Sequence, residues 1–353
     1  MSDKIKVLMI GPDRGVHGGI SALVNSYYEA GLQDSVELKY IGTMKEGSKL
    51  KKLMVAGLAF MDFMRIVDRY DIVHVNCSSD SSFMRKSFFI RYAKRRGKKV
   101  LLHQHGGDFV NYYSNELGEN KKRYVRDILD MADEMLVLTD KWREFFGTLT
   151  DKSKIHVLPN GVVTAGIDRS ETGPGDMDKI LFLGRICRDK GVKELIEAVK
   201  EIHKENDRVR LYVGGIFEEP ELLKDIEENS TFIKHIGWVS GSDKNRYLEE
   251  CGIMAVPSYF EGFGLSVVEG MLHGCCVVAS NVGGIPDIVE DGVDGLLVEP
   301  KSAAALKNAI ERVMNDKDLA DKLSDNGKKK ALEKYSIEKI VSQLLSHYRQ
   351  ILG

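Results

Sequence analysis

IMAVPSYFEGFGLSVVEGM, residues 253–271, contains one complete strand–loop–helix unit. Its first six residues form a short apolar run, which is typical of a buried β-strand. Gly262 and Gly264 then lead into a helical pattern that begins near Leu265. The first amide groups of such a helix favour a phosphate or another anion. The stretch is therefore both a structural unit and a candidate ligand loop.

The same alternation of β-rich runs and helical patterns continues to both ends of the chain. We expect strands at residues 5–11, 71–76, 98–105, 135–139, 155–160, 179–184, 209–215, 232–238, 253–258, 275–280 and 294–299. Helical patterns include residues 19–30, 50–67, 121–131 and 142–149. Strands that alternate with helices predict parallel sheets covered on both faces, an α/β fold.

A polar, glycine-rich segment at residues 163–177 interrupts the alternation, and we interpret it as a linker. The length of 353 residues also favours two domains. We expect an N-terminal domain at residues 1–165 and a C-terminal domain at 166–335, with a cleft between them. The last helix, residues 336–353, carries apolar residues at helical spacing, so it needs a surface to cover.

The composition, with 43% apolar and 29% charged residues, is that of a globular protein and excludes a disordered or fibrous chain. The longest apolar stretch, residues 53–61, is too short for a spanning helix. The first eleven residues lack the apolar core of a signal peptide, so we expect a cytoplasmic protein. The five cysteines never form a Cys-x-x-Cys pair, which favours reduced thiols over disulfides or a zinc site.

Positive charge is concentrated in the first half of the chain. Residues 1–165 hold 26 Lys and Arg against 20 Asp and Glu, and residues 85–99 contain no acid. Aromatic residues are interleaved with these cations over residues 83–99, a pattern that suits a peripheral helix on an anionic bilayer. An ordinary solvated helix that covers a sheet fits the segment equally well. We expect no nucleic-acid partner, because the whole chain is slightly acidic and lacks a recognised motif.

Loops at the carboxyl ends of parallel strands carry the chemistry of open α/β sheets. The first such loop places Gly15, Gly18 and Gly19 before a helix, which suits a phosphate. The loop HQHGGDF, residues 103–109, brings two histidines to one face of a strand without an apparent third metal ligand. We expect one of them, His105, to touch substrate and the other to pack, with two structural histidines as the alternative.

The second half of the chain supplies charged side chains at strand ends. Arg185 directly follows a strand and Lys190 precedes a helix, a pair suited to clamping a diphosphate. Glu261 and Glu269 flank the glycines of the opening stretch and suit hydroxyl recognition, although paired carboxylates also occur in glycosidases. The pairs Asp176 with Asp178, in the linker, and Asp316 with Asp318, on a helix, follow no strand, so we expect no obligatory metal.

These motifs together resemble the retaining glycosyltransferases of family 4, also called glycosyl transferases group 1. The resemblance covers nearly the whole chain and rests on the glycine-rich first loop, DIVHVN (71–76), HGGD (105–108), VLPNGV (157–162), the GR…KG pair (184–191), EGFGLSVVEGM (261–271) and GGIPDIV (283–289). It implies the GT-B fold, in which two Rossmann-like domains, each a doubly wound parallel sheet, face a central cleft. Gly107 and Asn281 depart from the residues common in the family.

The resemblance also implies roles for individual residues. The donor is a nucleotide diphosphate sugar of UDP or GDP type, which is a substrate, and no cofactor is needed. The implied catalytic residues are His105, Arg185, Lys190 and Glu261, and the implied donor-binding residues are Gly18, Gly19, Gly184, Val239, Phe263, Gly264, Leu265 and Glu269. In this assignment the two cations hold the diphosphate, Glu269 binds the ribose, and His105 approaches the transferred sugar.

The acceptor is not visible in the sequence, and we expect a glycan or a lipid-linked molecule in cell-surface glycan or glycolipid synthesis. Three other functions share parts of this pattern. A sugar-nucleotide epimerase has the same two domains and the clamp. A non-catalytic binding subunit is disfavoured because Arg185, Lys190, Glu261 and Glu269 are all present. A phosphorylase is disfavoured because no pyridoxal lysine is evident.

Overall fold

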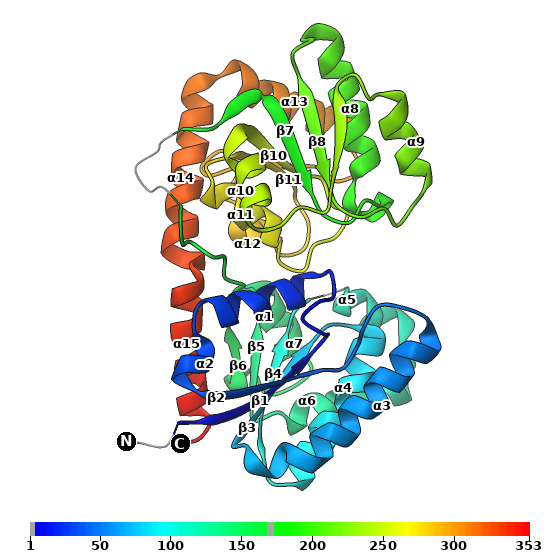
Figure 1. Ribbon diagram of the computed structural model, residues 1–353, viewed down its shortest axis with the longest axis vertical. Coiled ribbons are helices and arrows are strands. Elements are labelled where there is room, and N and C mark those ends of the chain that lie inside the picture. The colour runs from blue at the N-terminus through cyan, green and yellow to red at the C-terminus, as the bar shows by residue number, and fades with distance from the viewer. Residues whose placement is uncertain (1–3, 107, 168–172) are drawn as a thin grey trace. The chain divides into compact units, whose positions relative to one another are not determined.

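The computed structural model describes residues 4–106, 108–167 and 173–353. The chain divides into two compact units: unit 1 comprises Met1–Val163 with Ile337–Gly353, and unit 2 comprises Thr164–Ser336. Each unit contains one six-stranded sheet in which the named strands pair in parallel (Figure 1). Two sheets of this kind confirm the predicted α/β class.

The sheet of unit 1 has the strand order β2-β1-β3-β4-β5-β6. Its strands are β1 (Lys6–Gly11), β2 (Glu37–Gly42), β3 (Ile72–Cys77), β4 (Lys99–Gln104), β5 (Glu134–Val137) and β6 (Ile155–Val157). Its helices are α1 (Gly19–Glu29), α2 (Leu32–Ser35), α3 (Lys49–Ile66), α4 (Asp80–Arg95), α5 (Phe109–Asn111), α6 (Glu119–Met131), α7 (Asp140–Gly147) and α15 (Ile337–Gln350).

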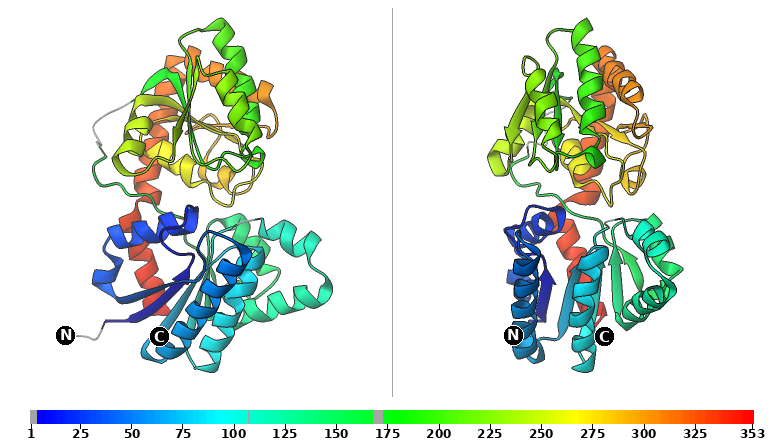
Figure 2. Two further views of the ribbon diagram at one scale, coloured as in Figure 1. Left: turned by 45° about the vertical axis from the view of Figure 1, so that its right-hand side comes forward. Right: turned by 90° about the vertical axis from the view of Figure 1, so that its right-hand side faces the viewer.

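The last helix, α15, covers the face of this sheet that α1 also covers (Figure 2). Its apolar stripe, which includes Ile340, Leu344 and Tyr348, is buried in the same cluster as Val7 and Leu101 of the sheet. Burial of such a stripe is the usual source of stability for a helix of this length. The C-terminal segment therefore completes the core of unit 1.

The sheet of unit 2 has the strand order β12-β11-β10-β7-β8-β9. Its strands are β7 (Asp176–Leu183), β8 (Arg210–Gly214), β9 (Ile233–Gly237), β10 (Cys251–Val256), β11 (Cys276–Ser280) and β12 (Leu296–Val298). Its helices are α8 (Val192–Glu205), α9 (Glu221–Glu228), α10 (Gly241–Glu250), α11 (Leu265–Leu272), α12 (Ile285–Ile288), α13 (Ala303–Asn315) and α14 (Lys317–Tyr335). One apolar core lies under α8 and α13.

Two sequence-based assignments were incomplete or wrong. The edge strand β2 was missed, because its charged and tyrosine-containing sequence ELKYIG is largely solvent-accessible and lacks the continuous apolar run of a central strand. Asp176 and Asp178 belong to β7 and not to a linker, since pairing of Asp176 with Cys251 of β10 extends this strand toward its amino end. Residues 168–172 of the expected linker lie outside the described residues.

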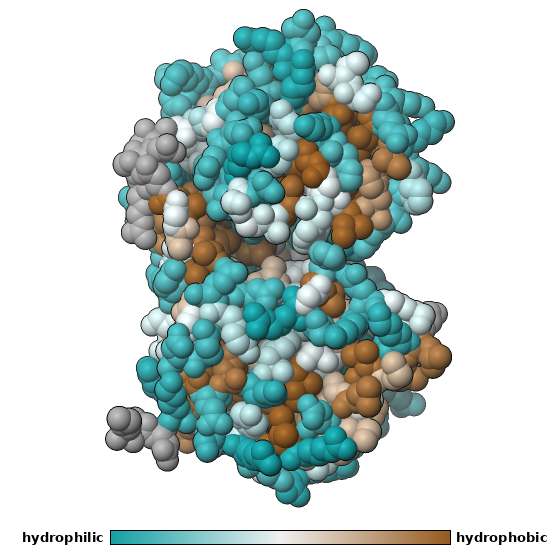
Figure 3. All heavy atoms as spheres, in the orientation of Figure 1, coloured by the Kyte–Doolittle hydropathy of each residue, from teal (hydrophilic) through white to brown (hydrophobic). Residues whose placement is uncertain are grey.

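Helix α3 is apolar on two faces. Phe63 is buried, whereas Leu50, Leu53, Met54, Leu58 and Met61 are exposed. Apolar side chains accordingly gather over α3, at the lower right of the view in Figure 3. Within the described residues, no helix has the length and apolar character needed to cross a bilayer.

Candidate active site

The strand order of unit 2 reverses between β7 and β10, its two central strands. At such a switch point the loops after the two strands separate, and ligands bind beyond their carboxyl ends. Here these loops are residues 184–191, after β7, and residues 257–264, after β10. They carry half of the twelve residues that were predicted from the sequence, including Arg185, Lys190 and Glu261.

Lys190 and Glu261 meet at this point. The Lys190 ammonium forms a short ion pair with Glu261 Oε1, and the Ser258 hydroxyl donates to the same oxygen at 3.1 Å. Both charged side chains are largely covered, at 18% and 17% exposed. The backbone joins the loops as well, since Tyr259 N–H donates to Asp189 O at 2.8 Å. Lys190, predicted to bind the diphosphate, and Glu261, predicted to contact the sugar, are therefore direct partners.

Two glycines make this close approach possible. Gly191 has φ +67°, and a Cβ there would lie 2.0 Å from Pro257 O. Gly283, after β11, has φ +54°, and a Cβ there would lie 1.8 Å from Glu261 O. Any larger residue meets both a disfavoured backbone conformation and a backbone clash. These glycines hold the loop that carries Glu261 against its neighbours.

Arg185 and Glu269 have partners of their own. Arg185 Nη1 donates to Glu218 Oε2 at 2.7 Å, with both side chains about half exposed. Burial opposes the charge on Arg185, but the hydrogen bond and the charge of Glu218 outweigh it and raise the pKa of the guanidinium. Lys244 of α10 donates to Glu269 Oε1 at 2.7 Å. Arg185 and Glu269, which were both predicted to contact the donor, are thus each paired with an opposite charge.

The amino end of α11 lies beside this group of charges. Its N-cap residue, Gly264, has φ +99°, and no side chain caps the helix. The first amide groups of a helix carry partial positive charge, and without a cap they remain available to an anion. Phe263 and Gly264 are buried, and Leu265, the first helical residue, is partly exposed. Gly184 and Val239, at the ends of β7 and β9, are also partly exposed.

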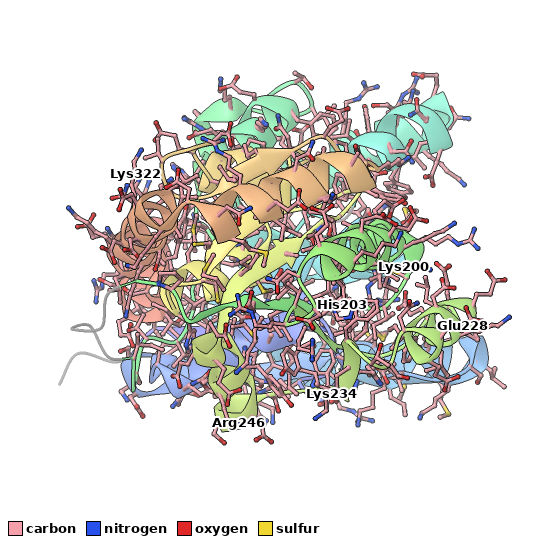
Figure 4. All side chains as sticks on the ribbon, turned by 90° about the horizontal axis from the view of Figure 1, so that it is seen from above. Lys200, His203, Glu228, Lys234, Arg246 and Lys322 are labelled. Atoms are coloured by element: carbon pink, nitrogen blue, oxygen red, sulfur yellow. The ribbon has the colours of Figure 1, made fainter. Side chains whose placement is uncertain are left out.

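A hollow of about 590 Å³ lies elsewhere in unit 2, between α9 and the strands β8 and β9. Figure 4 labels Glu228 and Lys234 in this region, together with His203 of α8, whose ring stacks on Phe232 with centroids 4.2 Å apart. Lys234 and Arg210 line the hollow near the amino ends of β9 and β8. It is therefore separate from the switch-point loops.

In unit 1, His105 follows β4 and lies beside Asn76 of β3. His105 Nε2 is 2.8 Å from Asn76 Oδ1, and Asn76 Nδ2 donates to Ile10 O at 3.2 Å. The second bond fixes the amide orientation, so Oδ1 accepts and Nε2 carries the proton. Burial, with the neighbouring charges of His74 and Lys86, lowers the pKa of His105 to about 3. The ring is therefore neutral at physiological pH.

His105 is the outer member of a chain of aromatic side chains. The His103 ring lies 4.0 Å from that of His105, His103 Nδ1 is 3.3 Å from His74 Nε2, and His74 Nδ1 is 2.6 Å from the Tyr348 hydroxyl of α15. His74, His103 and Tyr348 have no exposed surface. One of the two histidines, His103 and His105, was expected to pack, and the one with no exposed surface is His103.

The glycine-rich loop after β1 ends in the uncapped amino end of α1. A Cβ added to Gly18 or Gly19 would have no atom within 4 Å, so no contact within the described residues requires glycine there. Open space above a helix start suits the close approach of a ligand backbone or phosphate. Gly107 of the HGGD motif lies outside the described residues.

Several residues of these clusters were missed from the sequence. Lys244, Glu218 and Ser258 contact nominated residues, and Tyr348 and Lys86 lie behind His105. Lys244 had a usable signal, because it stands in the first turn of a helix that follows a strand end. The others are brought in by tertiary packing, for which a single sequence carries no local signal.

The basic segment 83–99 forms α4 and its C-terminal extension, and the expected display of aromatics beside cations is wrong for most of it. Phe83, Phe89 and Ile90 are buried, and only Phe88 among its large apolar side chains is exposed. Acids from other segments pair with two of its cations, Asp133 with Lys94 at 2.6 Å and Asp68 with Arg96. The alternative of a helix that covers a sheet describes α4.

The described residues contain no group of three or more His, Cys, Asp or Glu side chains able to hold a metal ion. All five cysteines are free and buried.

Comparison with known proteins matches each half of the chain to a glycosyltransferase family. Residues 166–330 match the family of glycosyl transferases group 1, and residues 35–165 match Glycosyltransferase Family 4. One curated relative, the capsular polysaccharide biosynthesis glycosyltransferase CapM of Staphylococcus aureus, is 30% identical over 178 residues, which cover 48% of this chain and 46% of that protein. The chain spans about half the length of the curated relatives it matches first.

Solved structures extend the likeness to the whole fold. The Alr3699/HepE protein of Anabaena, in complex with UDP and glucose, superposes with a TM-score of 0.78 at 18% identity and covers 98% of this chain and 100% of that chain. The sucrose-phosphate synthase of Thermosynechococcus elongatus superposes with a TM-score of 0.80 at 21% identity over 99% of both chains. The chain has the GT-B fold and contains a Glycosyltransferase Family 4 domain at residues 35–165 and a glycosyl transferases group 1 domain at residues 166–330.

Proposed function

We propose that the chain is a retaining, metal-independent glycosyltransferase that moves a hexosyl unit from a UDP- or GDP-type nucleotide sugar to a glycan or lipid-linked acceptor. The observation that carries the proposal is the Lys190–Glu261 pair at the switch point of unit 2, next to the uncapped amino end of α11. The UDP and glucose bound to the Anabaena neighbour and the capsular polysaccharide role of the S. aureus relative support the donor class and the pathway class.

Arg185 and Lys190 are assigned to the donor diphosphate. Each is already held by a carboxylate, Glu218 or Glu261, so its position is set before the donor arrives. An ammonium has three protons to donate, and one contact with Glu261 leaves two for phosphate oxygens. The amide groups of Phe263, Gly264 and Leu265 add partial positive charge at the same end of the sheet.

The remaining donor contacts follow from the same geometry. Glu269, held by Lys244 through Oε1, is assigned to the ribose hydroxyls. Glu261 is assigned to the sugar through Oε2, since Lys190 and Ser258 both use Oε1. Gly184, after β7, is assigned to the phosphates, and Val239, after β9, is assigned to the border of the base. In unit 1, Gly18 and Gly19 are assigned to phosphates.

The chemistry requires stabilisation of a departing diphosphate. Cleavage of the anomeric C–O bond develops positive charge on the sugar and negative charge on the phosphate oxygen. Fixed cations and helix-end dipoles directed at that oxygen stabilise the transition state more than the ground state. Retention follows if the acceptor hydroxyl attacks on the face of the leaving group and gives its proton to the departing phosphate oxygen. Neutral His105 is assigned to a hydroxyl of the transferred sugar.

The test compares two lysines of neighbouring segments. Lys190→Ala removes the buried clamp, whereas Lys193→Ala removes an exposed lysine whose only described ion pair is with Glu197. We expect release of nucleotide diphosphate from the donor to fall about 100-fold or more in Lys190→Ala and to remain unchanged in Lys193→Ala. The same assay with and without EDTA tests metal independence, and equal rates are expected.

Donor binding is measured separately through thermal stabilisation by UDP, GDP, ADP and TDP. Stabilisation by one of them, lost in Lys190→Ala, supports the clamp. Donor turnover into an isomeric nucleotide sugar would replace the transferase with an epimerase. Nucleotide binding without any turnover would assign a binding subunit. Absence of stabilisation by every nucleotide would contradict the donor site itself.

A further inference from the structure

The exposed apolar surface of unit 1 is concentrated on one helix face. Leu50, Leu53, Met54, Leu58 and Met61 of α3 are between 46% and 77% exposed, and Phe88 of α4 is 61% exposed. At 100° per residue, the five α3 positions form one stripe along the helix. Phe88 lies one turn before Tyr92, whose ring contacts Phe60 of α3, so the two helices present adjoining surface. A gathered apolar patch of this kind marks an interaction site.

The stripe is not a by-product of packing. Phe60 at the edge of the stripe and Phe63 on the opposite face already pack α3 against Phe89, with ring centroids 5.1 and 5.0 Å apart. Gly57 lies within the stripe, and a Cβ there would have no atom within 4 Å. Glycine inside a helix costs about 1 kcal/mol relative to alanine. No contact within the described residues of unit 1 accounts for either the leucines or the glycine.

The charges beside the stripe identify the partner. Lys51 and Lys52 are exposed in the first turns of α3 and Arg65 is exposed in its last turn, while Asp62 is the only acid of the helix. Lysines near a helix amino end oppose the helix dipole, so helix stability does not explain them. An apolar stripe flanked by cations is the surface that enters the headgroup region of an anionic bilayer.

The same charges disfavour a second copy of the chain. If two α3 stripes packed antiparallel, Lys51 of one copy would face Arg65 of the other, and a parallel arrangement would oppose Lys51 to Lys51. Either arrangement brings like charges together as the apolar surface is buried. An anionic lipid surface brings no like charges against these cations.

We propose that α3, through Leu50, Leu53, Met54, Leu58 and Met61 with Lys51 and Arg65 on the same side of the helix, docks unit 1 on an anionic bilayer surface. This inference relocates the membrane contact from the segment 83–99 to α3, and Phe88 is the one residue of that segment that takes part. It does not depend on the sugar chemistry, since no residue of the donor site lies in the patch.

The experiment is co-sedimentation of the full chain with vesicles of equal parts phosphatidylcholine and phosphatidylglycerol, and with vesicles of phosphatidylcholine alone. We expect binding to the anionic vesicles, weakened by added salt because the charge contribution is screened. The double variant Leu53→Ser/Leu58→Ser should lose at least about tenfold in vesicle affinity. Its control is Leu223→Ser, a change at an exposed leucine of α9 in unit 2, which should bind as the parent does.

Two charge-reversal variants complete the test. Lys51→Glu/Arg65→Glu should lose the preference for anionic vesicles, while Lys224→Glu on α9 should keep it. Leu58→Trp gives a direct reading, because tryptophan emission shifts to shorter wavelength on entering a bilayer. Equal binding to neutral vesicles, no vesicle binding by the parent, or a dimer in light scattering that Leu53→Ser disrupts would each overturn the proposal. Unchanged thermal unfolding and nucleotide stabilisation in these variants would separate this outcome from a failure of the donor site.

Discussion

Lys86 is a buried charged side chain. It has 1% exposed surface, and it donates a hydrogen bond of 2.8 Å to the neutral hydroxyl of Ser82. Burial lowers its pKa from 10.5 to about 8. A lysine that is harder to protonate in the folded chain than in the unfolded chain lowers stability wherever both are charged. The difference corresponds to about 3 kcal/mol at pH 7.

Replacing Lys86 with methionine should therefore stabilise unit 1. We expect the free energy of unfolding at pH 7 to rise by about 1–3 kcal/mol in Lys86→Met, since the desolvation penalty is removed and the Ser82 bond is lost. The gain should shrink between pH 8 and pH 10.5, because the folded parent sheds its proton first over that range. Denaturant titration of both proteins at pH 7 and pH 10 checks this, and a destabilised variant would contradict it.

A second prediction at the residue scale concerns Gly283. Both Gly283 and Gly292 have positive φ, at +54° and +70°, so alanine is strained by about 1 kcal/mol at either position. Only at Gly283 does the added Cβ also meet a backbone atom, the Glu261 carbonyl oxygen at 1.8 Å. Gly283→Ala should thus displace Glu261 and abolish stabilisation by nucleotide, whereas Gly292→Ala should only lower the melting temperature slightly. Thermal unfolding with and without nucleotide distinguishes the two, and equal behaviour would contradict the clash argument.

Sequence reasoning at this scale found residues but not their partners. Arg185, Lys190 and Glu261 were predicted because each lies in a loop after a strand beside glycines, and Glu269 because it lies one turn into the helix that follows such a loop. That Lys190 binds Glu261, 71 residues away, depends on the switch point between β7 and β10, which no local pattern records. The roles assigned to these residues remain predictions.

At the scale of single elements, central strands and long helices were predictable because their periodicity is set by burial. The edge strand β2 was not, since an edge strand with charged residues has no continuous apolar run. The helix α4 was recognised, but the side on which its aromatics lie depends on α3, which covers them. Amphipathic patterns therefore identify a helix more reliably than they identify what its apolar face contacts.

The element-scale prediction concerns α15, which is attached to β3 by one hydrogen bond between buried groups. Tyr348→Phe removes the hydroxyl that lies 2.6 Å from His74 Nδ1 and leaves that nitrogen buried without a partner. We expect a loss of about 1–3 kcal/mol in the free energy of unfolding. Tyr212→Phe in unit 2 is the control, because the Tyr212 hydroxyl makes no hydrogen bond with the described residues. Equal stability of the two variants would show that the His74 contact contributes nothing.

At the scale of the whole chain, the two units carry unequal numbers of buried neutral histidines. In unit 1, burial holds the pKa values of His74 and His103 well below the ordinary value and that of His105 at about 3. In unit 2, the pKa of His273 is lowered to about 4. The unfolded chain binds protons at these sites below about pH 6.5 and the folded units do not, so the free energy of unfolding falls as the pH falls.

This imbalance predicts that unit 1 unfolds first on acidification. At pH 5 each such histidine lowers the free energy of unfolding by about 2 kcal/mol, so the three of unit 1 lower it by about 6 kcal/mol and His273 lowers that of unit 2 by about 2 kcal/mol. A typical domain has a total stability of only about 5–15 kcal/mol. Trp142 reports on unit 1 by fluorescence in a Trp238→Phe background, and labelling of buried Cys276 reports on unit 2. The fluorescence of Trp142 should change at a higher pH than the pH at which Cys276 becomes reactive. Coincident transitions would mean that the units unfold together, and the reverse order would mean that groups other than the histidines set the acid stability.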